Sequence, residues 1–221
     1  MTRNITRLLR ANGFVLVAIA AGVLMLLAVA GLSKVQTPTA TLGGGFPKAI
    51  FDADGRARLP DRYRRWANVG TRYKPNGRNI LDGKPIVTPQ LMNTYVEPSA
   101  LDRYKETGKW PDGAQIVKEL SDIRVDKDCD TVTHICSSPV GAGIFQERYI
   151  GVGMMVKDAK RFRDAPGNWG YFGFQRGKSG YDTVAELRPQ EQCASCHVKL
   201  ASDTDYVISR AHLGLSPDNI Q

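Results

Sequence analysis

An alternating pattern runs through Ala114-Gln115-Ile116-Val117-Lys118-Glu119-Leu120-Ser121-Asp122-Ile123. Every second side chain of a β-strand points to the same face of its sheet, so this stretch predicts a strand. Ile116, Lys118 and Leu120 then share one face, where a lysine stands between two aliphatic side chains. Such a lysine either extends its amine to water at a sheet edge or occupies a pocket. In a pocket, desolvation would lower its pKa and leave a neutral, nucleophilic amine.

Elements on both sides of this stretch define the fold class. Further strands are predicted at residues 93–96, 148–156 and 169–175, and an amphipathic helix is predicted at 99–107. A helix is also expected over 60–68, and helical structure over the C-terminal region. We therefore predict an α+β fold, in which helices pack against a mainly antiparallel sheet.

The N-terminus has the pattern of an export signal. Arginines and no acidic residue precede an apolar core over residues 14–32, and small residues predict cleavage after Ala30. The core also approaches the roughly 20 residues that span a bilayer, so an uncleaved anchor stays an alternative. Residues 1–30 are thus a signal peptide or a membrane anchor, and we expect the remainder of the protein in the periplasm. Residues 31–46 are a linker, and one domain is expected over 47–221.

The charge of the chain does not indicate a nucleic-acid-binding protein. The formal net charge is +8, and the basic residues are spread along the chain among acidic ones. Nucleic-acid-binding proteins usually show a dense basic stripe. We therefore expect no nucleic-acid partner.

The motif Cys193-Ala194-Ser195-Cys196-His197 carries the chemistry. Its C-x-x-C-H spacing is the attachment signature of c-type haem. Two thiols three positions apart lie on one side of a helical turn and can add to the two vinyl groups of a porphyrin, while His197 reaches the iron. The alternative, a thioredoxin-like redox pair, is disfavoured by the adjacent histidine and by the lack of a βαβ context. We therefore predict one covalently attached haem c, with His197 as the metal ligand.

The sequence offers no clear second protein ligand for the iron. No methionine follows His197, and Met92, Met154 and Met155 fall on or beside predicted strands, where a core role is more common. His212 either binds the iron or packs near the C-terminus, and we favour packing. An iron with one protein ligand keeps a position open for a small molecule.

Cys129 and Cys136 form a second cysteine pair. In an oxidising compartment they would close a short loop as a disulfide. His134 lies within that loop, so a metal site is the alternative, but zinc sites usually need four ligands. We therefore favour the disulfide.

Together these residues resemble the cytochrome P-460 family of exported monohaem proteins, to which the beta-type cytochromes c′ are related. The resemblance covers most of the chain after the linker. The matching segments occur in this order: Leu59-Pro60 with Tyr63-Arg64 and Trp66, Val69-Gly70-Thr71, Tyr95-Val96-Glu97-Pro98, Lys105 to Gly108, Asp112-Gly113, Val117-Lys118-Glu119-Leu120, Tyr149-Ile150-Gly151, Val156-Lys157-Asp158, Lys160-Arg161-Phe162 and Pro166-Gly167-Asn168-Trp169.

The resemblance implies a homodimer with its haem close to the C-terminus. It also implies a catalytic, cofactor-binding role for Lys118, which aligns with a family lysine bonded through its side-chain nitrogen to a porphyrin meso carbon. In such proteins hydroxylamine binds at the open iron site and is oxidised to nitric oxide or nitrous oxide. The electrons are expected to pass to a soluble cytochrome.

Two positions depart from the family pattern. Gly153 stands where some members carry a distal carboxylate, and Met92 stands where the family has an arginine. A base near the iron would speed the loss of protons from hydroxylamine, and Glu97 or Glu147 are candidates to replace it. The departures favour the alternative that the protein binds or scavenges nitric oxide without turnover, like beta-type cytochromes c′. A plain electron carrier is a third possibility.

Overall fold

The computed structural model describes residues 48–216. The predicted signal peptide or anchor at 1–30 and the linker at 31–46 lie outside the described residues and stay predictions. Within 48–216, no helix has the length and apolar composition needed to cross a bilayer.

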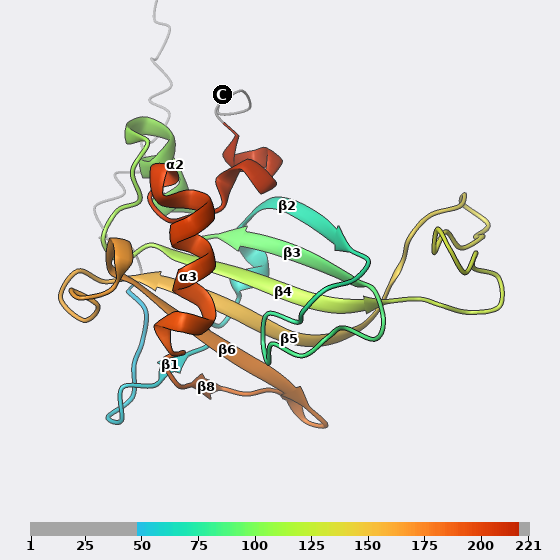
Figure 1. The fold of residues 1–221 in the computed structure, drawn as a ribbon, viewed down its shortest axis with the longest axis horizontal. Helices are drawn as coiled ribbons and strands as arrows, with labels where there is room; N and C mark the ends of the chain where they lie inside the picture. Colours follow the sequence, from blue (N-terminus) through green and yellow to red (C-terminus); the bar gives the residue numbers. More distant parts are fainter. Residues whose placement is uncertain (1–47, 217–221) are drawn as a thin grey trace, which may run out of the picture. The chain divides into compact units, whose positions relative to one another are not determined.

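A six-stranded antiparallel sheet forms the centre of the described domain (Figure 1). Each strand pairs with its neighbour in the sequence, in the order β2-β3-β4-β5-β6-β7. The strands are β2 (Ala67–Lys74), β3 (Gln90–Val96), β4 (Gln115–Ile123), β5 (Gln146–Lys157), β6 (Trp169–Gly177) and β7 (Gly180–Tyr181). Two short strands, β1 (Ala57–Arg58) and β8 (Val184–Ala185), pair separately. The predicted antiparallel sheet with packed helices is confirmed.

The side chains of the sheet divide between its two faces as the alternation requires. On one face, Ile116 of β4 packs with Met155 of β5 and Tyr171 of β6 in a cluster that also contains Ala194. On the opposite face, Val117 packs in a second cluster, whose residues from β5 and β6 are Val152, Met154, Val156, Phe172 and Phe174. Both faces are therefore covered, and β4 is buried between them.

Two α-helices accompany the sheet. Helix α2 (Pro98–Thr107) begins where the Glu97 carboxylate accepts hydrogen bonds from the backbone N–H groups of Ser99 and Ala100, which satisfies two free donors of the first turn. Helix α3 (Gln190–Ala201) lies across the sheet over β6 (Figure 1). Its small residues Ala194 and Ala201 are buried and allow the helix to approach the strands closely.

Two sequence predictions about local structure are wrong. The helix expected over 60–68 is only a 3-10 turn, Tyr63–Arg65, and the chain enters β2 at Ala67. The pattern of one buried and two exposed residues suggested an amphipathic helix. A single turn is enough to bury Tyr63 in the core and to expose Arg64 and Arg65. In the C-terminal region, helix α3 ends at Ala201 and only short 3-10 turns follow.

The loop between β4 and β5 projects beyond the end of the sheet (Figure 1). Cys129 and Cys136 form the predicted disulfide in it. His134 lies in the same loop, but its Nδ1 is 2.9 Å from the hydroxyl of Tyr73. Among residues 48–216 no group of three or more His, Cys, Asp or Glu side chains is arranged to hold a metal ion.

Candidate haem site

Helix α3 presents the C-x-x-C-H motif to one side of the sheet. Cys193, Cys196 and His197 stand at positions i, i+3 and i+4 and therefore lie on neighbouring turns of one helical face. Both thiols are free, Cys193 partly buried against the core and Cys196 exposed. Burial raises the pKa of the Cys193 thiol. The helix thus holds two unbonded thiols at the spacing that attachment to a porphyrin requires.

The imidazole of His197 is held in one orientation. Its Nδ1 is 2.7 Å from the backbone oxygen of Tyr206, so Nδ1–H donates and Nε2 is left to bind a metal. The ring packs against that of Tyr171, with centroids 4.8 Å apart. Burial lowers the pKa of His197. A neutral imidazole with a fixed tautomer is the form that ligates iron.

Lys118 lies on the same face of the sheet as α3. Its neighbour on that face, Ile116, packs in one apolar cluster with Ala194 and Cys193 of the helix. Strand β4 is central in the sheet, so Lys118 does not lie at a sheet edge, and that part of the predicted alternative is wrong. Desolvation and the nearby cations Arg72 and Lys74 lower the pKa of Lys118 to about 8. The positive charge of Lys118 in turn contributes to lowering the pKa of His197, so the predicted site residues act on one another.

Small residues surround Lys118 in its row of the sheet. The register aligns it with Thr94 and Gly70 on one side, and with Gly153 and Gly173 on the other. Because glycine has no side chain, a side chain from another segment packs over each of these glycines. His212 packs over Gly70, Ile80 over Gly153 and Arg188 over Gly173. Lys118 is therefore the long side chain of a row that is otherwise small.

Two buried polar atoms beside this row have no hydrogen-bond partner within residues 48–216. They are Oγ1 of Thr94 and Nδ1 of His212, on side chains only 1% and 5% exposed. Burial is the main cause that lowers the pKa of His212 to about 4. A buried polar atom without a partner costs free energy, and a bound group commonly provides the partner. These two atoms are thus available to hydrogen-bond a bound polar group beside Lys118.

The remaining sequence candidates have other roles. Met92, Met154 and Met155 are buried in the apolar clusters of the sheet, as expected for core residues. His212 is buried beside Gly70, and its packing role stays a prediction. Both oxygens of Glu97 cap α2, and Glu147 is exposed. A carboxylate that replaces the family one near Lys118 stays a prediction.

Sequence reasoning missed several residues that shape the site. Arg72 stands opposite Met92 in the β2–β3 register, so a guanidinium is present one strand away from the expected arginine position. Thr94 follows from the register of β3 on β4, which one sequence does not give. The carbonyl of Tyr206 carries no side-chain signal and was not predictable.

These features define a haem-binding protein built on an antiparallel sheet, with a C-terminal helix that supplies thiols and a histidine. A comparison with protein-family models agrees: the model of the Cytochrome P460 family matches residues 60–209. The chain belongs to the cytochrome P460 family. No curated protein sequence matches the chain. Membership of this family implies a haem cofactor, and the residues described above fit one.

Proposed function

We propose that this protein is an exported c-type cytochrome that oxidises hydroxylamine at one covalently attached haem. The observation that carries the proposal is the position of Lys118, a desolvated lysine on the α3 face of the central strand. A pKa of about 8 leaves roughly a tenth of its side chains neutral at pH 7, against about 0.03% for an ordinary lysine. This roughly 300-fold enrichment supports its role as the nucleophile that forms the cross-link to the macrocycle.

Each residue of the site has a defined part in this proposal. Cys193 and Cys196 provide the thioether bonds, and His197 binds iron through Nε2 while Nδ1–H stays bonded to Tyr206. The haem supplies an iron with one open position and the capacity to accept electrons. Oγ1 of Thr94 and Nδ1 of His212 have no partner within residues 48–216, and beside Lys118 they can orient a small polar substrate.

The reaction releases electrons that a partner must remove. One hydroxylamine that ends as nitric oxide loses three electrons and three protons. Two that end as nitrous oxide and one water together lose four of each. A soluble one-electron cytochrome in the periplasm is the proposed acceptor, and a homodimer the proposed assembly. Family membership is the support for these two partners, and an N-terminal anchor would hold the protein at the membrane.

Nitric oxide binding without turnover is the second candidate, and one feature favours it. The space at Gly153, beside Lys118, is filled by the apolar Ile80, whose Cδ1 lies 3.2 Å from where a Cβ would be. Leu81, Met92 and Leu120 form an apolar cluster at this end of the same face. An apolar pocket accepts a diatomic gas but lacks the base that hydroxylamine oxidation favours.

The test is turnover together with the state of Lys118. The protein matured with haem is mixed with hydroxylamine and an artificial one-electron acceptor, and the same is done with Lys118→Met and with Lys178→Met, an exposed lysine that serves as the control. We expect multiple turnovers in the wild type and in Lys178→Met, and loss of turnover in Lys118→Met. Mass spectrometry should find the Lys118 peptide joined to the Cys193–Cys196 peptide.

Two results would reject this function. A haem that takes up nitric oxide but gives no turnover, with trypsin cutting freely after Lys118, would establish the binding candidate. A haem inert to both ligands would indicate a plain electron carrier.

A further inference from the structure

The backbone that faces His197 has an unusual conformation. Asp205 and Tyr206 are consecutive residues with positive φ, 52° and 62°. This left-handed region is disfavoured for residues with a side chain, and it persists only where surrounding groups enforce it. The result of the turn is that the Tyr206 carbonyl points to Nδ1 of His197, 2.7 Å away.

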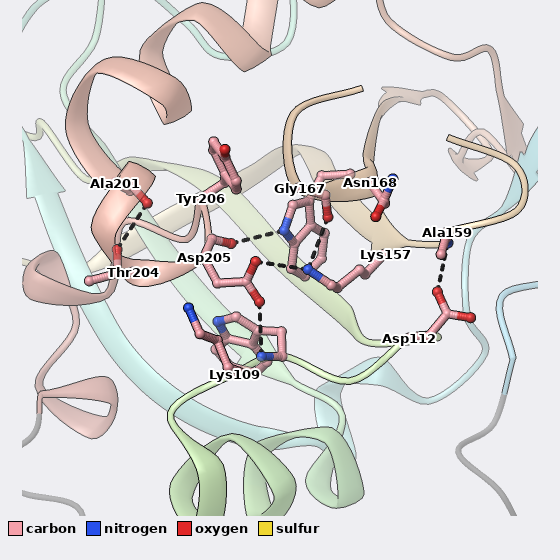
Figure 2. A network of polar contacts seen from close by, with 12 residues as sticks. Lys109, Asp112, Lys157, Ala159, Gly167, Asn168, Ala201, Thr204, Asp205 and Tyr206 are labelled. Carbon is pink, nitrogen blue, oxygen red and sulfur yellow. Dashed lines mark hydrogen bonds and ion pairs between the residues drawn. The ribbon is translucent and has the colours of Figure 1, made fainter. Parts of the chain in front are cut away.

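Asp205 is the residue through which the rest of the domain holds this turn (Figure 2). Its Oδ1 accepts from Nζ of Lys157 at 2.8 Å, and its Oδ2 accepts from the backbone N–H of Trp110 at 3.0 Å. Its own backbone oxygen accepts from Nε1 of Trp169 at 2.9 Å. Asp205 is thereby tied to β5, to β6 and to the segment before β4.

Lys157 extends the network to the opposite side of Tyr206. Its Nζ also donates to the carbonyl of Gly167 at 2.9 Å (Figure 2). The same Nζ lies over the ring of Trp169. The Tyr206 ring packs on Gly167 so closely that a Cβ there would stand 2.2 Å from Cδ2 of the ring. Lys157 thus binds both Asp205, which precedes Tyr206, and Gly167, on which the Tyr206 ring packs.

The ion pair between Lys157 and Asp205 is mostly buried, and this limits what it can contribute to stability. The side chains of Lys157 and Asp205 are 14% and 11% exposed. A pair this buried adds little net stability compared with apolar residues of similar size, because desolvation offsets the attraction. The pair does, however, favour one conformation of the turn at Asp205 and Tyr206. If the turn moved, Lys157 or Asp205 would be left as a buried charge without its partner.

We propose that Lys157 and Asp205 are positioning residues for the iron ligand: they fix the Tyr206 carbonyl as the acceptor for His197, and so set how strongly His197 donates to iron. The inference rests on the proposed function in so far as His197 must bind iron. A hydrogen bond from Nδ1–H raises the basicity of the imidazole. A stronger donor favours ferric iron and lowers the reduction potential.

The experiment uses the haem-containing protein without hydroxylamine. Resonance Raman spectroscopy of the ferrous form gives the iron–histidine stretching band, and a redox titration gives the potential. The variants are Lys157→Met, Asp205→Asn and the conservative Lys157→Arg. Lys160→Met is the matched control, since Lys160 is exposed in the loop that follows β5.

We expect Lys157→Met and Asp205→Asn to move the iron–histidine band to lower frequency and to raise the reduction potential. In Lys157→Arg, the band and the potential should stay close to their wild-type values. A simple loss of positive charge would do the opposite, because removing a cation near the haem lowers its potential. Lys160→Met should leave the band in place. Asp205→Asn keeps the size of the side chain, and its iron–histidine band provides the test should Lys157→Met fold poorly, because losing an anion raises the potential by itself.

An unchanged band in both variants, or a potential that falls equally in Lys157→Met and Lys160→Met, would overturn the proposal. A five-coordinate ferrous wild type without an iron–histidine band would refute the assignment of His197 and this inference with it. Absence of hydroxylamine turnover would refute only the proposed function.

Discussion

The environment of Lys118 can be tested without haem, through the dependence of stability on pH. The variant Lys118→Met removes the titrating group and keeps an unbranched chain on the same face of β4. The experiment uses protein made without haem attachment, so that the amine is unmodified. Urea titrations at several pH values then give the free energy of unfolding of the wild type and of the variant.

The expected size follows from the pKa of Lys118, which is 10.5 in the unfolded chain and about 8 in the folded protein. This difference corresponds to roughly 3 kcal/mol at pH 7. Lys118 is partly exposed, so water screens part of the effect, and we expect roughly 1–2 kcal/mol. Lys118→Met should therefore be more stable than the wild type at pH 7.

The direction of the pH dependence is fixed by linkage. The unfolded chain holds the Lys118 proton more tightly than the folded protein does, so between pH 8 and 10.5 it binds more protons. Wild-type stability gains from this group as the pH rises through that window. The advantage of Lys118→Met should be complete below pH 8 and largely lost by pH 10.5. Exposed Lys178→Met, measured in parallel, should show no such trend. A wild-type-to-variant difference that stays constant from pH 7 to 10 would refute the desolvated amine.

Three further predictions concern stability, each measured by urea titration of the haem-free protein. Thr94→Val removes a buried hydroxyl that lacks a partner within residues 48–216, and should raise the free energy of unfolding by about 1 kcal/mol; a loss would show that the hydroxyl is bonded. Glu119→Gln weakens the bonds from the Tyr63 and Tyr181 hydroxyls and should cost about 1–3 kcal/mol, whereas exposed Glu147→Gln should be neutral. Replacing Cys129 and Cys136 by serine should cost roughly 2–3 kcal/mol, and an equal loss for the reduced wild type would confirm that the bond is the cause.

The sequence predicted those parts of the fold whose signal is local. The strand pattern of 114–123 and the helix after Glu97 appear almost as expected, because each depends on alternation or on a cap within a few residues. The edge strand β2 was missed because its burial alternates weakly, so no period was visible. Its pairing with β3 comes from the sheet as a whole.

The site divides in the same way. The motif at Cys193, Cys196 and His197 is contiguous and could be predicted, whereas the role of Lys118 was predicted from the family resemblance, because its aliphatic neighbours left two environments open. The residues around Lys118 could not be predicted. Gly70 and Gly173 are placed in line with Lys118 only by the register of four strand pairs, which a single sequence does not give. The acceptor for His197 is a backbone carbonyl, which any residue type at position 206 would carry.

The two faces of β4 connect the stability of the fold to the chemistry of the site. Lys118 and Glu119 are adjacent, so they point to opposite faces of the sheet. Glu119 is 1% exposed, and its Oε1 accepts from the Tyr63 hydroxyl at 2.5 Å and from the Tyr181 hydroxyl at 2.7 Å. The guanidinium of Arg64 binds the same carboxylate.

A slip of β4 by one residue would exchange the faces of both charged side chains. Glu119 would then lose all three partners, and a buried carboxylate without partners is far more costly than a misplaced aliphatic side chain. The tyrosines and the arginine therefore specify the register of the strand from the face opposite α3. Because the register is specified there, Lys118 is held on the α3 face although its desolvation disfavours the charged amine. The position of Lys118 is thus determined by the contacts of its neighbour Glu119.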